Sequence, residues 1–166
     1  MSWPRKARRG LWSAVALATA ALLGPVPVHA GSPDLTADLD GRPIPLVDVG
    51  RYACHDIDYP RIHCFGTQAA RDISAAPFLA AASSSYVIAW DQASYAGASF
   101  VFSEDYTVLA IIGWNDRISS FKVQNSQTGH WYTDWFYGGS SWYFCCNSQV
   151  PFLNAYNDLF SSVHRF

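Results

Sequence analysis

The C-terminal half of the chain has the hydrophobic pattern of short β-strands. Residues 98–102 and 140–144 place β-branched and aromatic residues at alternating positions. Residues 118–123 and 160–166 alternate apolar with polar side chains. Between residues 86 and 166 no stretch of useful length follows the helical period. The pattern therefore predicts strands, and no α-helix, in this half of the chain.

These strands belong to an internal repeat. Residues 88–124 lie over residues 130–166 with an offset of 42. Each copy opens with an aromatic residue, has a second aromatic residue five positions later, and has a glycine two positions after that. The two sets are Trp90, Tyr95 and Gly97, and Tyr132, Tyr137 and Gly139. A glycine there supplies positive φ while the aromatic ring packs over the turn, which predicts a folded hairpin in each copy.

The strongest agreement between the copies is a polar loop. Asn115-Asp116-x-x-Ser119-Ser120 in the first copy corresponds to Asn157-Asp158-x-x-Ser161-Ser162 in the second. Four short strands in each copy, with aromatic-rich cores, predict a β-sandwich of two Greek keys.

Both signatures occur twice and in the same order. Because of these two signatures, residues 86–166 resemble a βγ-crystallin domain of the secreted bacterial type. The family's hairpin signature is aromatic-x4-aromatic-x-Gly, and its calcium signature is Asn/Asp-Asn/Asp-x-x-Ser/Thr-Ser. The resemblance implies an all-β fold in which two Greek-key motifs form a βγ-crystallin β-sandwich, with residues 31–85 as a small N-terminal extension. It covers about half of the chain and implies nothing about that extension.

The resemblance also implies two calcium ions held between the paired loops. One site would use the Asp91 and Arg117 carbonyls with the Ser119 and Asp158 side chains. The other would use the Thr133 and Leu159 carbonyls with the Ser161 and Asp116 side chains. Calcium prefers such hard oxygen ligands, and one carboxylate per site predicts an affinity of about 10⁻⁶ to 10⁻³ M. Without an ion, the same loops would be polar turns shaped by their Asn and Ser side chains.

The first thirty residues have the composition of a secretory signal peptide. A basic segment with Arg5, Lys6, Arg8 and Arg9 precedes an apolar stretch at residues 11–23. This stretch is shorter than the roughly 20 residues that span a bilayer. We therefore expect cleavage after Ala30, a secreted protein of 136 residues and no membrane span. The export route stays open.

Residues 31–85 divide into a polar lead, residues 31–45, and a more compact part. Residues 51–54 and 61–65 predict two strands around a turn, and residues 67–73 a short helix that Pro77 interrupts or ends. The segment is too small for an independent domain, so we expect an appendage packed on the sandwich. Residues 81–85 mark its boundary with the domain of residues 86–166.

Export makes disulfides the expected state of Cys54, Cys64, Cys145 and Cys146. Four cysteines allow three pairings. A bond between neighbours strains the backbone, which mildly favours linking Cys145 and Cys146 to the extension, but the pairing of Cys54 with Cys64 stays open. Zinc bound by Cys54, His55, His63 and Cys64 is disfavoured, because adjacent ligands lack the usual spacing.

Charge and motifs exclude several functions. From residue 31 onward, seven basic against thirteen acidic residues give a net charge of −6, which argues against a nucleic-acid partner. No G-x-S-x-G or H-E-x-x-H motif occurs, and Glu104 is the single glutamate, so we expect no enzyme. The alternative to calcium binding is a protease inhibitor, or a module that binds an extracellular protein or sugar through aromatic side chains. The candidates are Trp131, Tyr132, Trp135, Phe136, Tyr137, Trp142 and Tyr143.

Overall fold

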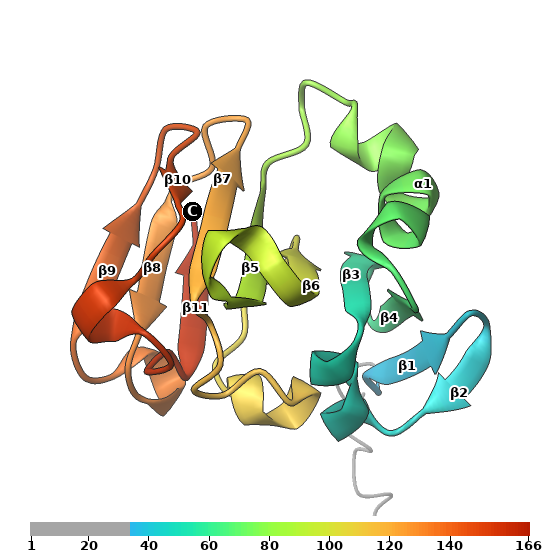
Figure 1. Ribbon diagram of the computed structural model, residues 1–166, viewed down its shortest axis with the longest axis horizontal. Helices are drawn as coiled ribbons and strands as arrows, with labels where there is room; N and C mark the ends of the chain where they lie inside the picture. Colours follow the sequence, from blue (N-terminus) through green and yellow to red (C-terminus); the bar gives the residue numbers. More distant parts are fainter. Residues whose placement is uncertain (1–33) are drawn as a thin grey trace, which may run out of the picture. The chain divides into compact units, whose positions relative to one another are not determined.

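The computed structural model describes residues 34–166, and the predicted signal peptide lies outside them. Two sheets organise the chain (Figure 1). The larger has the strand order β10-β7-β5-β6-β3-β4-β1-β2, and the smaller has the order β11-β8-β9. The strands of the repeat are β5 Tyr86–Gln92, β6 Ala96–Phe102, β7 Ser120–Gln124, β8 Gly129–Tyr132, β9 Ser141–Phe144, β10 Gln149–Val150 and β11 Ser162–Arg165.

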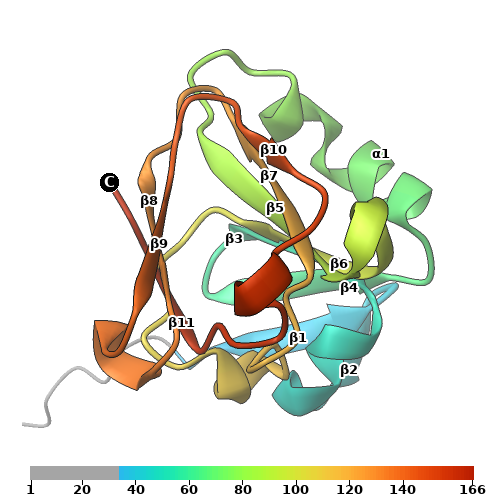
Figure 2. The same ribbon diagram turned by 60° about the vertical axis from the view of Figure 1, so that its left-hand side comes forward.

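The two copies of the repeat exchange strands. The first copy supplies β5, β6 and β7 to the larger sheet, and the second supplies β8, β9 and β11 to the smaller one. Strand β10 of the second copy pairs with β7, while Tyr106 of the first copy bridges to Val163 on β11. Figure 2 shows the two sheets facing each other. The predicted all-β sandwich of two Greek keys is confirmed.

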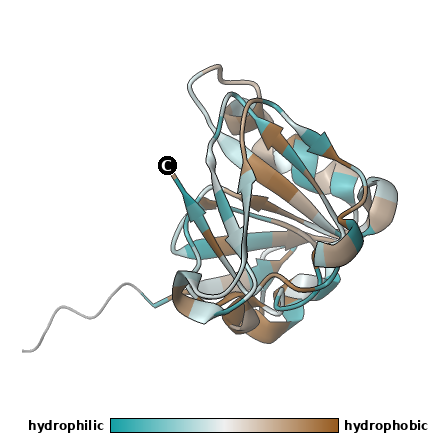
Figure 3. Ribbon diagram, turned by 90° about the vertical axis from the view of Figure 1, so that its left-hand side faces the viewer, coloured by the Kyte–Doolittle hydropathy of each residue, from teal (hydrophilic) through white to brown (hydrophobic). Residues whose placement is uncertain are grey.

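The core between the sheets is rich in aromatic residues. Trp131 on β8 is fully buried, and its ring packs against Phe102 and Phe121 of the first copy and Phe144 and Phe160 of the second. Alternating side chains point to opposite faces of a strand, and Figure 3 shows hydrophobic and hydrophilic residues mixed along the strands. Each copy therefore buries its apolar face against the other.

The extension continues the larger sheet. Its strands are β1 Thr36–Leu39, β2 Arg42–Ile44, β3 Ala53–Asp58 and β4 Arg61–Phe65, and β3 pairs in parallel with β6. The polar lead of residues 31–45 is thus partly a hairpin that the hydrophobic pattern did not predict. Its turn residues Asp40 and Gly41 both have positive φ, and this Asp-Gly pair is the signal that could have found it.

The helix of the extension is longer than predicted. Helix α1 spans Gln68–Leu79, with Thr67 as its N-cap and Pro77 inside it, so the prediction that Pro77 interrupts or ends a short helix is wrong. A proline loses the hydrogen bond to the carbonyl four residues earlier and crowds that carbonyl, and packing of the helix outweighs this cost. The helix packs on β3 and β4. From it the buried Arg71 guanidinium donates to the Ser99 hydroxyl on β6, which joins the extension to the repeat.

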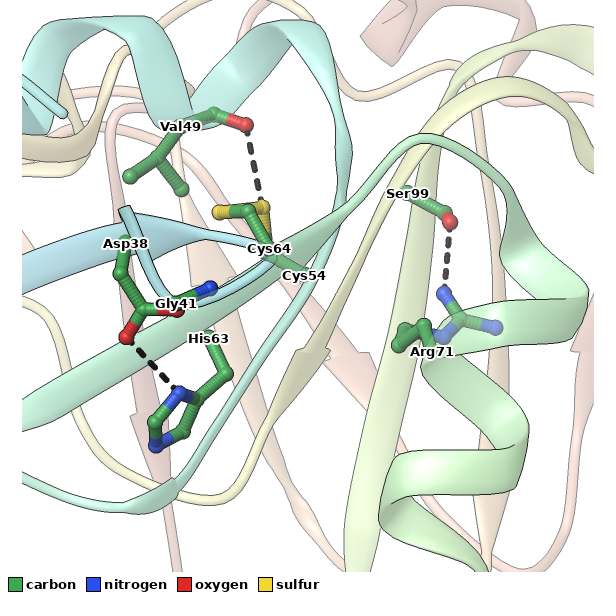
Figure 4. Close-up of a disulfide and its surroundings, with 8 residues drawn as sticks. All are labelled: Asp38, Gly41, Val49, Cys54, His63, Cys64, Arg71 and Ser99. Atoms are coloured by element: carbon green, nitrogen blue, oxygen red, sulfur yellow. Dashed lines mark hydrogen bonds and ion pairs between the residues drawn. A yellow bond between two sulfur atoms is a disulfide. The ribbon is translucent and has the colours of Figure 1, made fainter. Parts of the chain in front are cut away.

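The disulfides join Cys54 to Cys64 and Cys145 to Cys146. The mildly favoured link between the extension and the domain is therefore wrong. Cys54 and Cys64 are directly opposite partners on β3 and β4, with Cα atoms 4.0 Å apart, so the sheet register brings them together (Figure 4). Cys145 and Cys146 are adjacent in the turn after β9 and bond to each other.

Candidate functional site

The two polar loops of the repeat lie against each other and exchange backbone hydrogen bonds. The Asp116 N–H donates to the Phe160 carbonyl, at 3.0 Å, and the Asp158 N–H donates to the Ile118 carbonyl, at 3.1 Å. Asp116 and Asp158 both have positive φ, a conformation that Asn and Asp adopt more readily than most residues. Each loop therefore places its carboxylate beside the other copy.

Asparagine side chains orient these two carboxylates. The Asn115 amide donates to Oδ2 of Asp116 at 2.6 Å, and the Asn157 amide donates to Oδ2 of Asp158 at the same distance. In both residues Oδ1 faces a serine of the opposite copy. The loop-shaping role expected of the Asn residues thus takes a specific form, which is to fix the rotation of a carboxylate.

The first set of oxygens, which we call the Asp158 site, surrounds Ser119. The nearly buried Ser119 hydroxyl is 2.9 Å from Oδ1 of Asp158 and 3.2 Å from the Asp91 carbonyl oxygen. Beside it, the Arg117 guanidinium donates to Oδ2 of Asp91 at 2.8 Å, and Oδ1 of Asp91 is buried without a partner in the described residues. A positive charge therefore borders this site.

The second set, which we call the Asp116 site, surrounds Ser161. Its hydroxyl is 3.2 Å from Oδ1 of Asp116. Asp116, Thr133 and Ser161 line one pocket together with Asn115, Asp134 and Trp135. Asp134 adds a second carboxylate to this pocket, and nothing in the loop motif pointed to it.

The last serine of each loop holds the folded hairpin in place. The Tyr95 N–H donates to the Ser120 hydroxyl, which donates to the Gln92 carbonyl, at 3.1 and 2.7 Å. The second copy repeats this arrangement with Tyr137, Ser162 and Asp134, at 3.1 and 2.7 Å. The hairpin glycines Gly97 and Gly139 have positive φ, as expected, and no room for a side chain.

Solved structures with a similar fold cover half of the chain. A βγ-crystallin from an archaeon is 26% identical, with a TM-score of 0.44, and covers 49% of this chain and 98% of its own. A βγ-crystallin domain from Clostridium beijerinckii is 26% identical, with a TM-score of 0.44, and covers 49% and 97%. A βγ-crystallin from Ciona intestinalis is 20% identical, with a TM-score of 0.45, and covers 49% and 99%.

The repeated signatures thus fold into crossed loops and paired hairpins on two Greek keys. In this half the chain is similar to βγ-crystallin domains. In addition, the family model of peptidase inhibitor family I36 matches residues 75–144, which include all of the first copy and part of the second. No curated protein matches the sequence.

The crossed loops bring together the side chains predicted for each site. Ser119 meets Asp158, and Ser161 meets Asp116. Of the predicted carbonyls, that of Asp91 lies beside Ser119. The Arg117, Thr133 and Leu159 carbonyls accept no hydrogen bond from any residue in the described part of the chain. These carbonyl oxygens therefore keep their lone pairs for another partner.

The residues weighed for zinc are used otherwise. Cys54 and Cys64 are consumed by their disulfide. Nδ1 of His63 lies 2.9 Å from Oδ2 of Asp38 (Figure 4), and Nε2 of His55 lies 3.3 Å from the Ser74 hydroxyl. Burial, aided by the nearby His63, lowers the pKa of His55 to about 4. Across residues 34–166, no group of three or more His, Cys, Asp or Glu side chains is placed to hold a metal ion.

The structure divides the aromatic cluster. Trp131 is core, and Trp142 packs against Phe121 and Tyr156. Tyr143, its neighbour on β9, is 51% exposed, as strand alternation predicts. The remaining exposed members are Trp135 and Phe136 in the hairpin, at 52% and 71%. Among the described residues, no helix has the length and apolar character needed to cross a membrane.

Proposed function

We propose that residues 86–166 form a βγ-crystallin domain of a secreted protein, which binds two calcium ions at the crossed loops and has no enzymatic activity. The observation that carries the proposal is the exchange of carboxylates between the copies. Asp158 reaches Ser119, and Asp116 reaches Ser161. An ion at either site would therefore contact both copies of the repeat.

The residues present fit calcium in their chemistry. Every predicted ligand is an oxygen atom from a carboxylate, a hydroxyl or a backbone carbonyl, the donors that calcium prefers. Asn115 and Asn157 hold one oxygen of each carboxylate and leave the other directed at a serine. The Asp158 site would use Asp91, Arg117, Ser119 and Asp158. The Asp116 site would use Asp116, Thr133, Leu159 and Ser161.

The main consequence of binding would be stabilisation of the fold. A ligand that binds only the folded state at one hundred times its dissociation constant adds about 2.7 kcal/mol to the unfolding free energy. Each calcium would bridge the two Greek keys at the point where their loops cross. Unfolding would have to release both ions, because neither copy alone contains a complete site.

The two sites should differ in affinity. The Arg117 guanidinium beside the Asp158 site repels a cation, while Asp134 at the Asp116 site attracts one. We expect Arg117→Gln to raise the calcium affinity of the Asp158 site by roughly three- to tenfold and to leave the other site unchanged. Calorimetric titration of the parent and the variant measures both sites.

Arg51→Gln is the matched control for this titration, because Arg51 also pairs with an aspartate, Asp48, but on the exposed surface of the extension. It should leave both affinities at the parental value. Equal affinities of the two sites in the parent, or an unchanged titration of Arg117→Gln, would contradict the assigned role of Arg117.

A second candidate function is inhibition of a peptidase, which the match of residues 75–144 to peptidase inhibitor family I36 favours. Inhibition of representative metallo-, serine and cysteine peptidases by the purified protein, with calcium and with a chelator, tests it. Inhibition by the calcium-free protein would support this function. If no peptidase is inhibited while calcium is bound, the family match reflects the shared fold.

A further inference from the structure

The turn between β9 and β10 contains a disulfide between neighbouring residues, Cys145 and Cys146. The Ser148 N–H donates to the Cys145 carbonyl at 3.0 Å and closes the turn. Its two central residues, Cys146 and Asn147, have φ values of 66° and 61°, the pattern of a type I′ turn. Cys146 is exposed and Cys145 is half-buried. Solvent can therefore reach this disulfide.

The other disulfide is in the opposite situation. Cys54 and Cys64 are both fully buried, in two central strands of the extension. A thiol that attacks a disulfide needs access to one of its sulfur atoms. Reduction of Cys54–Cys64 therefore requires the surrounding sheet to open, whereas reduction of Cys145–Cys146 does not.

The turn is also held by contacts that do not depend on its disulfide. Oδ1 of Asn147 accepts a hydrogen bond from the Ser126 N–H at 2.9 Å, and the Ser148 carbonyl accepts one from the Val123 N–H at 2.8 Å. A bond between neighbours encloses no chain segment, so opening it releases almost no loop entropy. The fold should therefore survive when this bond is broken.

We propose that Cys145–Cys146 is a thiol-exchange site that reacts with small external thiols while the protein stays folded. The attacking thiolate forms a bond to Sγ of Cys146, the more exposed of the two residues. The bond between the two cysteine sulfurs breaks, and Cys145 leaves as a thiolate that takes a proton from water. The product is a mixed disulfide on Cys146, and no other oxidant or reductant takes part.

Two outcomes follow from this mixed disulfide. The neighbouring Cys145 thiolate can attack it, expel the small thiol and restore the original bond. With a dithiol, the second thiol of the reagent attacks instead, so the reagent leaves as a cyclic disulfide and both cysteines are reduced.

Differential alkylation tests the proposal on the intact, oxidised protein. The folded protein is treated with increasing concentrations of dithiothreitol, and free thiols are blocked with iodoacetamide. The remaining disulfides are then reduced in denaturant and labelled with N-ethylmaleimide before peptide mass spectrometry. We expect iodoacetamide to label Cys145 and Cys146 at dithiothreitol concentrations at least about tenfold below those needed for Cys54 and Cys64. Near-ultraviolet circular dichroism should show the folded state at that point.

The buried pair is the internal control for access. The Cys145→Ser, Cys146→Ser double variant should take no iodoacetamide label until dithiothreitol reduces Cys54 and Cys64. Equal reactivity of all four cysteines, loss of the folded signal with the first label, or first labelling of one cysteine from each half of the chain would overturn the proposal. The parent protein alone gives each of these results, so the test does not depend on folding of the variant.

Discussion

Replacing Trp131 with alanine should lower the free energy of unfolding by about 3–5 kcal/mol, the cost of removing a large aromatic side chain from a core. Trp131 is fully buried, and its ring centroid lies 5.4–5.9 Å from those of Phe102, Phe121, Phe144 and Phe160. Two of these rings come from each copy of the repeat. The variant therefore weakens the contact between the copies, which denaturant unfolding of parent and variant measures.

Tyr143→Ala is the control for this prediction. Tyr143 lies on the adjacent strand β9, but on the outer face of the sheet with half of its surface exposed. Its loss should cost less than about 1 kcal/mol. If the two variants lose the same stability, the assignment of the core to the space between the sheets is wrong.

The second large effect concerns two neighbouring residues of β3 whose ionisation is perturbed in opposite directions. Burial lowers the pKa of His55 from 6.5 to about 4. Burial also raises the pKa of Asp56 from 3.8 to about 6, although Ser103 donates two hydrogen bonds to its Oδ1. Both groups are therefore neutral in the folded protein near pH 5, and both are charged in the unfolded chain.

The signs of the two contributions are opposite. Below pH 6.5 the unfolded chain protonates His55 and the folded protein does not, so stability falls as the pH drops from 6.5 to 4. Above pH 3.8 the unfolded chain releases the Asp56 proton while the folded protein keeps it, so stability falls as the pH rises from 3.8 to 6. In the parent the two contributions largely cancel.

Single variants should separate these contributions. Relative to the parent, His55→Gln should gain stability as the pH falls from 6.5 to 4, and Asp56→Asn should gain stability as the pH rises from 4 to 6. Each gain should reach about 3 kcal/mol, because one pKa unit corresponds to about 1.36 kcal/mol. Denaturant unfolding at a series of pH values measures both. Curves that run parallel to the parent would show that neither group is buried as described.

The sequence predicted the parts of the fold that repeat. Two copies of the hairpin and loop signatures, 42 residues apart, were enough to predict the Greek keys, because each signature places glycine, aromatic and serine residues where a local backbone conformation requires them. Ser120 and Ser162 show this most clearly, since both bond the same hairpin position in their own copies.

The extension was harder to predict, because long-range contacts determine its structure. The parallel pairing of β3 with β6 joins residues such as Cys54 and Phe100 that no local pattern relates. The pairing of Cys54 with Cys64 follows from the register of β3 and β4, which periodicity does not provide. Helix α1 continues through Pro77 because it packs on β3 and β4, and such packing can override the local preference.

At the candidate site, the motif identified the carboxylates and hydroxyls but not the residues that modify them. Asp134 reaches the Asp116 site only because the hairpin of the second copy folds over the loop. The orienting role of Asn115 and Asn157 depends on side-chain rotation, which spacing in a sequence does not define.

The most direct test of calcium binding at the crossed loops is the thermal midpoint of the protein from residue 31 onward, measured in a chelator and in millimolar calcium. An Asp116→Asn, Asp158→Asn double variant serves as the control, since it removes both carboxylate charges and keeps the shape of the loops. Binding at both loops predicts that calcium raises the midpoint of the parent by about 10 °C and leaves that of the variant unchanged. The same midpoint for the parent in chelator and in calcium, or an equal rise in the variant, would contradict it.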